Sequence, residues 1–478
     1  MSLGVDGLST AWAIVRPDLI AAIGFLLAAA VTVHVLLHKR DVAAAVGWIG
    51  LAFLSPVLGP ILYVLFGINR VGRRARRLRD AGGVQTDATP RSTALVPERL
   101  ASLDRATQTI AGQPPATTES VVVLRCGDEA YPAMIAAIEG AGHSVGLTTY
   151  ILDVDAVGRA FLDALAAAKE RGVEVRVLVD GIGSGYFFPA AYGELRRRGV
   201  TAERFMHSSL PWRMPFLNLR SHKKLLVVDG RVAFLGGMNI SADNLASAPP
   251  ERRVVDTHFR IAGPVCGQLV ADFAQDWAFA AGEELEGPKW WPTMASHDGP
   301  RAMAVSSGPD EDIEKIEFTM LQAFACAESS IRLMTPYFLP SEPIVSSLAM
   351  AAMRGIDVDI VLPAKSNHRI VDWAEQAHIE PLLRNGVRIW RNPPPFDHSK
   401  LLVIDDCWSF IGSANLDVRS LRLNFELNVA TFDGPTAGAV SALIRSRSVD
   451  QVTIGDLEQR PRLAQLRDAA ARLALPYL

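Results

Sequence analysis

The chain contains two copies of the pattern H-x-K-x-x-x-x-D, whose residue types can attack and stabilise a phosphoryl group. The copies consist, in order, of His222, Lys224, Asp229, His398, Lys400 and Asp405. Corresponding residues are 176 positions apart, as 398 minus 222 gives for the histidines. A Gly and an Asn follow at the same separation, so Gly236 and Asn239 correspond to Gly412 and Asn415. One copy alone would be weak evidence, but two aligned copies predict a matched pair of chemical groups.

Each copy suits chemistry at phosphorus. Strand alternation would place His222 and Lys224 on one face, with an apolar run burying the rest of the strand. A neutral imidazole can attack phosphorus or relay a proton near neutral pH, and the lysine supplies positive charge to phosphoryl oxygens. Asn239 adds a neutral donor to the first set, and Asn415 and Ser413 add donors to the second. Two such sets, facing each other across a pseudo-twofold axis, would form one phosphodiester site.

The elements that must position these groups also repeat. Residues 171–180 (RGVEVRVLVD) are echoed by 354–363 (RGIDVDIVLP), in the same order as the motifs. Apolar runs that predict strands alternate with Ala-rich stretches that predict helices. We therefore expect an α/β fold with two homologous lobes, residues 120–295 and 296–450, each a β-sheet flanked by helices.

The most hydrophobic part of the chain lies before residue 70. Residues 19–37 carry no formal charge and are long enough, at about 1.5 Å per residue, to cross a hydrocarbon core of about 30 Å. A second uncharged stretch, 42–68, follows a short polar turn. We expect a two-helix transmembrane hairpin within residues 1–69. Pro56 and Pro60 interrupt the second stretch, which leaves a kink or a partly re-entrant segment open.

Charge sets the expected orientation of this hairpin. Six arginines follow the second stretch, namely Arg70, Arg73, Arg74, Arg76, Arg77 and Arg79. They outnumber the Lys39–Arg40 pair in the turn, so the positive-inside rule predicts both hairpin ends and all later residues in the cytoplasm. Residues 70–119 are expected to form a basic juxtamembrane segment and linker. The amphipathic segment 451–478 is expected either on the membrane surface or packed on the second lobe.

Composition narrows the function classes. Of 478 residues, 48 are Lys or Arg and 51 are Asp or Glu, which gives a net charge of −3. Chains that bind nucleic acid usually show a basic excess, so this balance argues against that class. The four cysteines form no C-x-x-C pair, and we expect reduced thiols and no structural zinc site.

The paired motifs, followed by GGMN at 236–239 and GSAN at 412–415, resemble the two HKD motifs of the phospholipase D superfamily. The amino-terminal hairpin, TPYFLP at 335–340 and VRSLRLNFE at 418–426 narrow the resemblance to bacterial cardiolipin synthases. It covers nearly the whole chain. It implies two phospholipase D-like lobes and a multi-pass protein of the bacterial cytoplasmic (inner) membrane, with the lobes facing the cytoplasm.

The resemblance also implies a reaction. One histidine attacks the phosphorus of a phosphatidylglycerol and forms a phosphatidyl-histidine, while the other protonates the departing glycerol. The second histidine then deprotonates the hydroxyl of another phosphatidylglycerol, which takes the phosphatidyl group and becomes cardiolipin. Superfamily analogy assigns His222 as the nucleophile and His398 as the acid and base.

Supporting residues follow from the same resemblance. A carboxylate downstream of each motif orients each histidine, and Glu426 holds that position in the second lobe. Asp256 is the candidate in the first lobe. We expect the motif aspartates, Asp229 and Asp405, to brace strand ends rather than to take part in chemistry. No metal or other cofactor is implied, because the lysines and asparagines supply the charge stabilisation.

Alternatives remain open. A membrane-bound phospholipase D, or a phosphatidyltransferase with another donor such as phosphatidylethanolamine, would share this site and differ in the alcohol used. A non-catalytic lipid-binding scaffold is the alternative from another class, and the two intact motifs argue against it. We expect phosphatidylglycerol, other anionic phospholipids and the membrane as partners, and no nucleic acid. Self-association to a homo-oligomer is left open.

Overall fold

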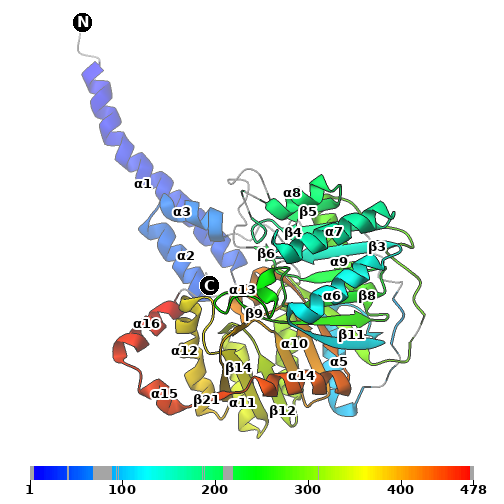
Figure 1. Cartoon of the computed structure of the whole chain (residues 1–478). Helices are drawn as coiled ribbons and strands as arrows, with labels where there is room; N and C mark the ends of the chain where they lie inside the picture. The colour runs from blue at the N-terminus through cyan, green and yellow to red at the C-terminus, as the bar shows by residue number, and fades with distance from the viewer. Residues whose placement is uncertain are drawn as a thin grey trace. The chain divides into compact units, whose positions relative to one another are not determined.

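The computed structural model describes residues 5–39, 42–67, 89–92, 94, 96–185, 187, 189–207, 219–295, 297–309 and 312–473 (Figure 1). They fall into two compact units. The N-terminal unit contains the described residues up to Gly67, and the main unit contains those from Thr89 onward. The arginines predicted to set the orientation, within 70–79, lie outside the described residues.

The first lobe of the main unit is built on a seven-stranded sheet in the order β2-β10-β8-β7-β3-β4-β5. Its strands are β2 (Ser120–Arg125), β3 (Ser144–Thr149), β4 (Glu174–Asp180), β5 (Thr201–Phe205), β7 (Leu225–Val228), β8 (Val232–Gly236) and β10 (Thr257–Ala262). Strands β3, β4 and β5 run parallel, as expected where helices connect them. The remaining neighbours are antiparallel.

The second lobe repeats this order as β11-β20-β18-β17-β12-β14-β15, with β1 (Ala116–Thr117) and β21 (Asp450–Val452) added at the two edges. Its strands are β11 (Arg301–Ser307), β12 (Ser330–Met334), β14 (Asp357–Pro363), β15 (Arg388–Asn392), β17 (Leu401–Ile404), β18 (Trp408–Gly412) and β20 (Asn424–Thr431). The parallel and antiparallel neighbours also match. The predicted α/β fold with two homologous lobes is therefore confirmed.

Helices accompany both sheets. The first lobe has α6 (Cys126–Glu139), α7 (Ala156–Glu170), α8 (Ala190–Arg197) and α9 (Cys266–Ala281), and the second has α10 (Lys315–Cys326), α11 (Glu342–Met353), α12 (Arg369–Arg384) and α14 (Gly434–Ser446). Helix α5 (Ala101–Ala111) precedes β1 and packs on α10. Local sequence fixes several helix starts. Asp155 caps α7 by accepting from Gly158 N, and Asp433 caps α14 by accepting from Thr436 N.

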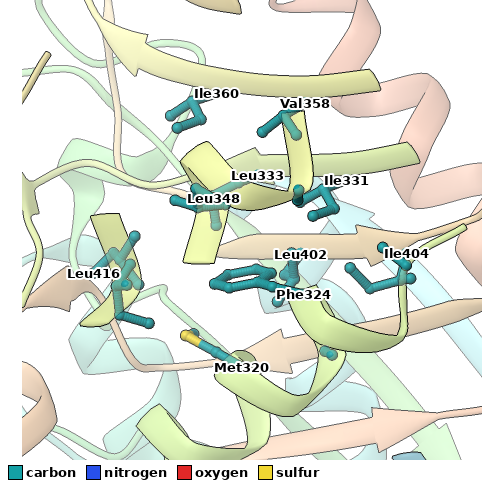
Figure 2. Close-up of a cluster of buried hydrophobic side chains, with 14 of the residues drawn as sticks. Met320, Phe324, Ile331, Leu333, Leu348, Val358, Ile360, Leu402, Ile404 and Leu416 are labelled. Atoms are coloured by element: carbon teal, nitrogen blue, oxygen red, sulfur yellow. The ribbon is translucent and has the colours of Figure 1, made fainter. Parts of the chain in front are cut away.

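A dense apolar core holds strand β17, which lies inside the second motif between Lys400 and Asp405. Leu402 and Ile404 of β17 lie among Ile331 of β12, Phe324 of α10 and other buried side chains (Figure 2). Burying one such side chain stabilises the fold by about 1.5–3 kcal/mol. In the first lobe, Leu226 on β7 is buried in the corresponding core. The polar motif residues before β7 and β17 are thus attached to rigid strands.

The N-terminal unit contains the two predicted apolar helices, and the second apolar stretch is broken. Helix α1 (Val5–His38) contains a stretch, Ala21–His38, that is long and apolar enough to cross a membrane. The second stretch is not one helix. Helix α2 (Val42–Leu54) ends before Pro56, and α3 (Leu58–Leu62) and the π-helix η1 (Tyr63–Gly67) follow the break. A proline has no N–H for the helical ladder and clashes with the preceding turn, which explains the break.

The described part of the C-terminal segment packs on the second lobe. Helices α15 (Ile454–Glu458) and α16 (Arg462–Arg472) follow β21, and α16 lies against α12. Asp468 of α16 is buried, and the Arg467 guanidinium lies 4.6 Å from the centre of the Trp373 ring. Leu463 and Leu466 remain exposed on the same helix. Of the two predicted placements, the described residues adopt the packed one.

Candidate active site between the lobes

The two motif histidines meet where the lobes join. The ring centres of His222 and His398 are 6.4 Å apart, and the ring planes are inclined by 84°. Each histidine directly follows a two-residue strand, β6 (Arg220–Ser221) or β16 (Phe396–Asp397). Strand β6 pairs with β20 of the second lobe, whereas β16 pairs with β9 (Val254–Val255) of the first. Both histidines are therefore held by strand pairs that cross between the lobes.

Backbone hydrogen bonds extend these crossed pairs to the histidines themselves. His222 N donates to Phe425 O at 2.9 Å, and His398 N donates to Val255 O at 2.7 Å. Phe425 immediately precedes Glu426, and Val255 immediately precedes Asp256. The register thus brings each predicted orienting carboxylate to the histidine of the opposite lobe.

The side chains complete this exchange. His222 Nδ1 lies 3.0 Å from Glu426 Oε1, and His398 Nδ1 lies 2.8 Å from Asp256 Oδ2. A carboxylate can only accept, so Nδ1 carries the proton and Nε2 keeps the lone pair needed by a nucleophile or base. The structure brings both predicted carboxylates to the site. The sequence gives no indication that each carboxylate orients the histidine of the opposite lobe.

Glu426 is held by several donors. Ser413 Oγ donates to Oε2 at 2.6 Å and Asn424 Nδ2 donates to Oε1 at 3.2 Å, while the Ser420 hydroxyl donates to Oε1. Ser413 Oγ also accepts from Leu427 N at 3.0 Å. The one hydroxyl proton of Ser413 is thus directed at Glu426, and contact of Ser413 with phosphate stays a prediction.

A small difference between the motifs has a steric cause. Gly237 of GGMN occupies the position that Ser413 holds in GSAN. A side-chain carbon at Gly237 would lie 2.4 Å from Asp256 Oδ1, closer than real contacts allow. The Asp256 carboxylate therefore fills the space that the serine side chain takes in the second lobe.

Both motif lysines are buried at the site. Lys224 Nζ donates to His222 O at 2.7 Å, and Lys400 Nζ donates to His398 O and lies 2.8 Å from His398 Nδ1. Burial lowers the pKa of Lys224 to about 7 and that of Lys400 to about 8. An anionic phosphate would restore their full charge and be stabilised by it.

The predicted asparagines differ in their surroundings. Asn239 is half-buried, and its Oδ1 accepts from Ile151 N at 3.3 Å. Asn415 is buried, and its backbone N–H donates to Ser420 Oγ at 2.9 Å. Asn415 Oδ1 has no hydrogen-bond partner among the described residues. The Asn415 side chain also hydrogen-bonds to Asp417.

Electrostatics favour neutral imidazoles beside charged carboxylates. Burial, reinforced by Lys400, lowers the pKa of His398 to about 3. Burial also lowers the pKa of His222, against the opposing pull of Glu426. Burial alone would raise the pKa of Glu426 and Asp256, but the facing histidines and lysines lower both. In the free site both imidazoles are therefore neutral near pH 7.

Aromatic rings cover the histidines, and sequence reasoning missed them. The Tyr150 ring centre is 5.2 Å from that of His222, and the Tyr337 ring centre is 6.0 Å from that of His398. Phe396 adds a third ring at 5.8 Å from His398. Tyr150 lies in VGLTTYIL at 145–152 and Tyr337 in IRLMTPYFLP at 331–340, two similar sequence blocks that were the signal available for finding them.

The motif aspartates serve the fold. Asp229 accepts hydrogen bonds from Gly142, His143 and Ser144 N, and Asp405 accepts from Glu328, Ser329 and Ser330 N. These donors lead into the central strands β3 and β12.

Across the parts of the chain that the structure describes, no group of three His, Cys, Asp or Glu side chains is arranged to hold a metal ion. Lys224 and Lys400 are cations at the site, and both add to the effect of burial in lowering the pKa of His222 and of His398.

Comparison with known proteins identifies the family of this chain. The family model described as cardiolipin synthase, phospholipase D-like domain, matches residues 134–277 and 320–447. The model of the phospholipase D-nuclease N-terminal region matches residues 26–67. In fold, the main unit resembles the crystal structure of phosphatidylserine synthase from Haemophilus influenzae Rd KW20, with a TM-score of 0.60 and 14% identity over 79% of this chain and 100% of that one.

Curated relatives cover nearly the whole chain. Cardiolipin synthase A of Pseudomonas putida GB-1 is 33% identical over 466 residues, which span 95% of this chain and 96% of that protein. Cardiolipin synthase of Geobacillus kaustophilus HTA426 is 31% identical over 456 residues, spanning 92% and 90%. The chain therefore belongs to the cardiolipin synthase family of phospholipase D-like proteins.

Proposed function

We propose that this protein is a cardiolipin synthase, a phosphatidyltransferase that joins two phosphatidylglycerol molecules and releases glycerol. The observation that carries the proposal is the facing pair of buried histidines, 6.4 Å apart between ring centres, each oriented by the carboxylate of the opposite lobe. One phosphorus between the rings would meet a nucleophile on one side and an acid on the other. The curated relatives named cardiolipin synthase support the choice of product.

The proposed first half-reaction uses both histidines. The negative charge of the bound phosphodiester favours the protonated form of His398. Nε2 of His222 then attacks the phosphorus, the bond from phosphorus to the glycerol oxygen breaks, and the protonated His398 donates its Nε2 proton to that oxygen. Lys224, Lys400 and the amides of Asn239 and Asn415 stabilise the negative oxygens of the five-coordinate transition state. Glu426 stabilises the charge that develops on His222.

The second half-reaction reverses these roles. His398, now neutral, takes the proton from a hydroxyl of a second phosphatidylglycerol. That oxygen attacks the phosphorus and the bond from phosphorus to His222 breaks, which gives cardiolipin and restores both histidines. No external oxidant or energy source is needed, because one phosphodiester replaces another.

The proposed location is the bacterial cytoplasmic membrane, with the main unit on the cytoplasmic side. The apolar stretch Ala21–His38 supports membrane anchoring, and the arginines within 70–79 support the orientation by their charge. Phosphatidylglycerol and other anionic phospholipids would then reach the site from the adjoining leaflet.

The proposal is tested with the full-length protein in vesicles of phosphatidylglycerol labelled in both the lipid and the headgroup glycerol. We expect labelled cardiolipin and free glycerol in equal amounts, and loss of both in His222→Ala and in His398→Ala. His143→Ala, an exposed histidine outside the site, is the matched control and should retain turnover. Phosphatidic acid in place of cardiolipin would indicate a phospholipase D, and lipid binding without turnover would indicate a scaffold. Either result overturns the proposal, and ethanolamine released from mixed vesicles would identify a second donor.

A further inference from the structure

The inference is based on the path of the second apolar stretch, residues 42–67. Helix α2 has 13 residues, about 20 Å of helix, and a single membrane crossing needs about 20 residues. After the break at Pro56, α3 and η1 add only ten more residues to Gly67. The question is whether these ten residues continue away from α2 or return beside it.

Contacts within the N-terminal unit show that they return. Tyr63 of η1 is fully buried in a cluster with Val31 and Val35 of α1 and Ala52 of α2. Tyr63 OH lies 2.7 Å from His34 Nδ1, and its ring centre lies 5.3 Å from that of Trp48. If residues 42–67 formed one straight span beside α1, position 63 would lie beside the Val5 half of α1, not beside His34.

The turn between α2 and α3 lies deep in the apolar part of the unit. A side-chain carbon at Gly24 would lie 2.6 Å from Pro56 Cβ, so the turn packs directly on α1 at this glycine. Gly24 is about 21 Å along the helix from His38, which is some two-thirds of a hydrocarbon core of about 30 Å. The turn therefore stops short of the Val5 end of α1.

The turn is compatible with a lipid environment. Ser55 N donates to Leu51 O at 3.0 Å and Gly59 N donates to Ser55 O at 2.7 Å, so helical hydrogen bonds continue across it. Pro56 has no N–H to satisfy. The surface of this pair is apolar, with exposed side chains that include Phe53, Leu54, Val57, Leu58, Ile61 and Phe66. Backbone that bends inside a bilayer needs such internal satisfaction.

Charge supports the same arrangement. In a two-span hairpin, Lys39 and Arg40 would lie on the opposite face from the arginines within 70–79, against the positive-inside rule. If the second stretch returns, both basic groups lie on one face. The aromatic residues Trp48 and Tyr63 then lie near that face, at the depth where Trp and Tyr are enriched.

We propose that the N-terminal unit crosses the bilayer once, through α1, and that residues 42–67 enter and leave one leaflet from the cytoplasmic face as a re-entrant helical pair. This helical pair would contact only the cytoplasmic leaflet, and the substrates would be drawn from the same leaflet. The proposal rests on membrane insertion and not on the chemistry proposed above, so cardiolipin formation can fail without affecting it.

Thiol accessibility in the full-length protein tests the topology. With the four native cysteines replaced by serine, single cysteines are introduced as Thr10→Cys, His38→Cys, Val42→Cys and Asp80→Cys. An impermeant maleimide is applied to spheroplasts and to inverted vesicles. We expect positions 38, 42 and 80 to label only in inverted vesicles and position 10 only in spheroplasts. Labelling of 38 and 42 in spheroplasts, with 80 in inverted vesicles, would overturn the proposal, as would labelling of every position in both preparations.

Crosslinking distinguishes the two paths independently. A short bifunctional thiol reagent should join the pair His34→Cys with Tyr63→Cys and leave the pair Pro17→Cys with Tyr63→Cys unjoined. A straight second span predicts the reverse, because position 63 would then lie near position 17. An unchanged elution volume of the serine background in size-exclusion chromatography, compared with the native chain, verifies that these proteins are folded.

Discussion

His222 Nδ1 lies 3.0 Å from Glu426 Oε1, although 204 residues separate them in the chain and they belong to different lobes. The mirrored pair, His398 and Asp256, is 2.8 Å apart. Each histidine thus depends on its own lobe for its strand and on the other lobe for its orientation. We therefore expect the activity of the site to depend on the pairing of each histidine with the carboxylate of the other lobe.

Glu426→Gln tests the exchange directly. The amide removes the charge that stabilises the His222 imidazolium and no longer selects the Nδ1–H tautomer, so kcat should fall by about 10²- to 10⁴-fold with little change in KM. Steady-state kinetics on phosphatidylglycerol vesicles give both constants. Glu375→Gln, a buried glutamate paired with Arg391 in the second lobe, is the control. A loss of similar size in the control would show that the effect is general destabilisation.

We expect the shifted pKa values of the histidine and lysine side chains to set both the acid limb and the basic limb of the pH profile of kcat/KM. The attacking imidazole of His222 must be neutral, and burial lowers its pKa, so the acid limb of kcat/KM should lie below pH 6.5. Burial lowers the pKa of Lys224 to about 7 and that of Lys400 to about 8, so charge is lost as pH rises through this range and kcat/KM should fall.

Bound phosphate should move the basic limb. Its negative charge favours the protonated lysines, so the fall in kcat should occur at higher pH than the fall in kcat/KM. Lys224→Arg keeps its charge and should move the basic limb of kcat/KM upward. Activity that is flat across the range from about pH 6 to about pH 9 would contradict the assigned role of the lysines.

The glycine and serine of GGMN and GSAN should not be interchangeable. Gly237→Ser would push against Asp256 Oδ1, so we expect kcat to fall by about 10²-fold as His398 loses its orientation. Ser413→Gly removes one of several donors to Glu426 and should cost about 10-fold or less. Gly193→Ser introduces the same side chain in open space on α8 and is the control. Equal activity of Gly237→Ser and the control would refute the steric argument.

Asp405→Ala should weaken the fold and spare the chemistry. Three backbone N–H groups lose their acceptor, which costs about 1–3 kcal/mol of unfolding free energy. These bonds lower the pKa of Asp405, despite the opposing effect of burial. The stabilisation is therefore present above the unfolded pKa of about 4 and is lost as pH falls through the lower folded pKa.

Denaturant unfolding of the full-length protein near pH 7 and near pH 3 measures this difference. The gap between the native chain and Asp405→Ala should narrow at the lower pH. Asp450→Ala, an exposed carboxylate on β21, should leave stability within about 0.5 kcal/mol. A large loss of kcat in folded Asp405→Ala would instead place Asp405 in the chemistry.

Repetition made the lobes predictable, because a constant separation between two motifs can be read without any structure. Contacts between the lobes left no such trace. Glu426 and Asp256 could be identified one per lobe, but their partners depend on how β6 meets β20 and how β16 meets β9. The residue type of Ser413 suits a phosphate donor, whereas its hydrogen bond to the nearby Glu426 depends on the fold.

Residue type alone also failed to predict the contacts of Lys223 and the path of the second apolar stretch. Lys223 stands between His222 and Lys224, yet its ammonium group pairs with Asp272 and Asp276 of α9 at 2.8 Å. In the second lobe Ser399 replaces it and bonds Asp397. The second apolar stretch was readable as hydrophobic, but only its contacts with His34 reveal the direction that it takes after Pro56.

The paired strands β6 with β20 and β16 with β9 also bear on biosynthesis. A ribosome releases His222 long before Glu426, so a growing chain that already exposes the first motif lacks the partner that orients its imidazole. A truncated chain is in the same condition. We expect such fragments to be inactive, because their first motif histidine lacks the carboxylate that orients it.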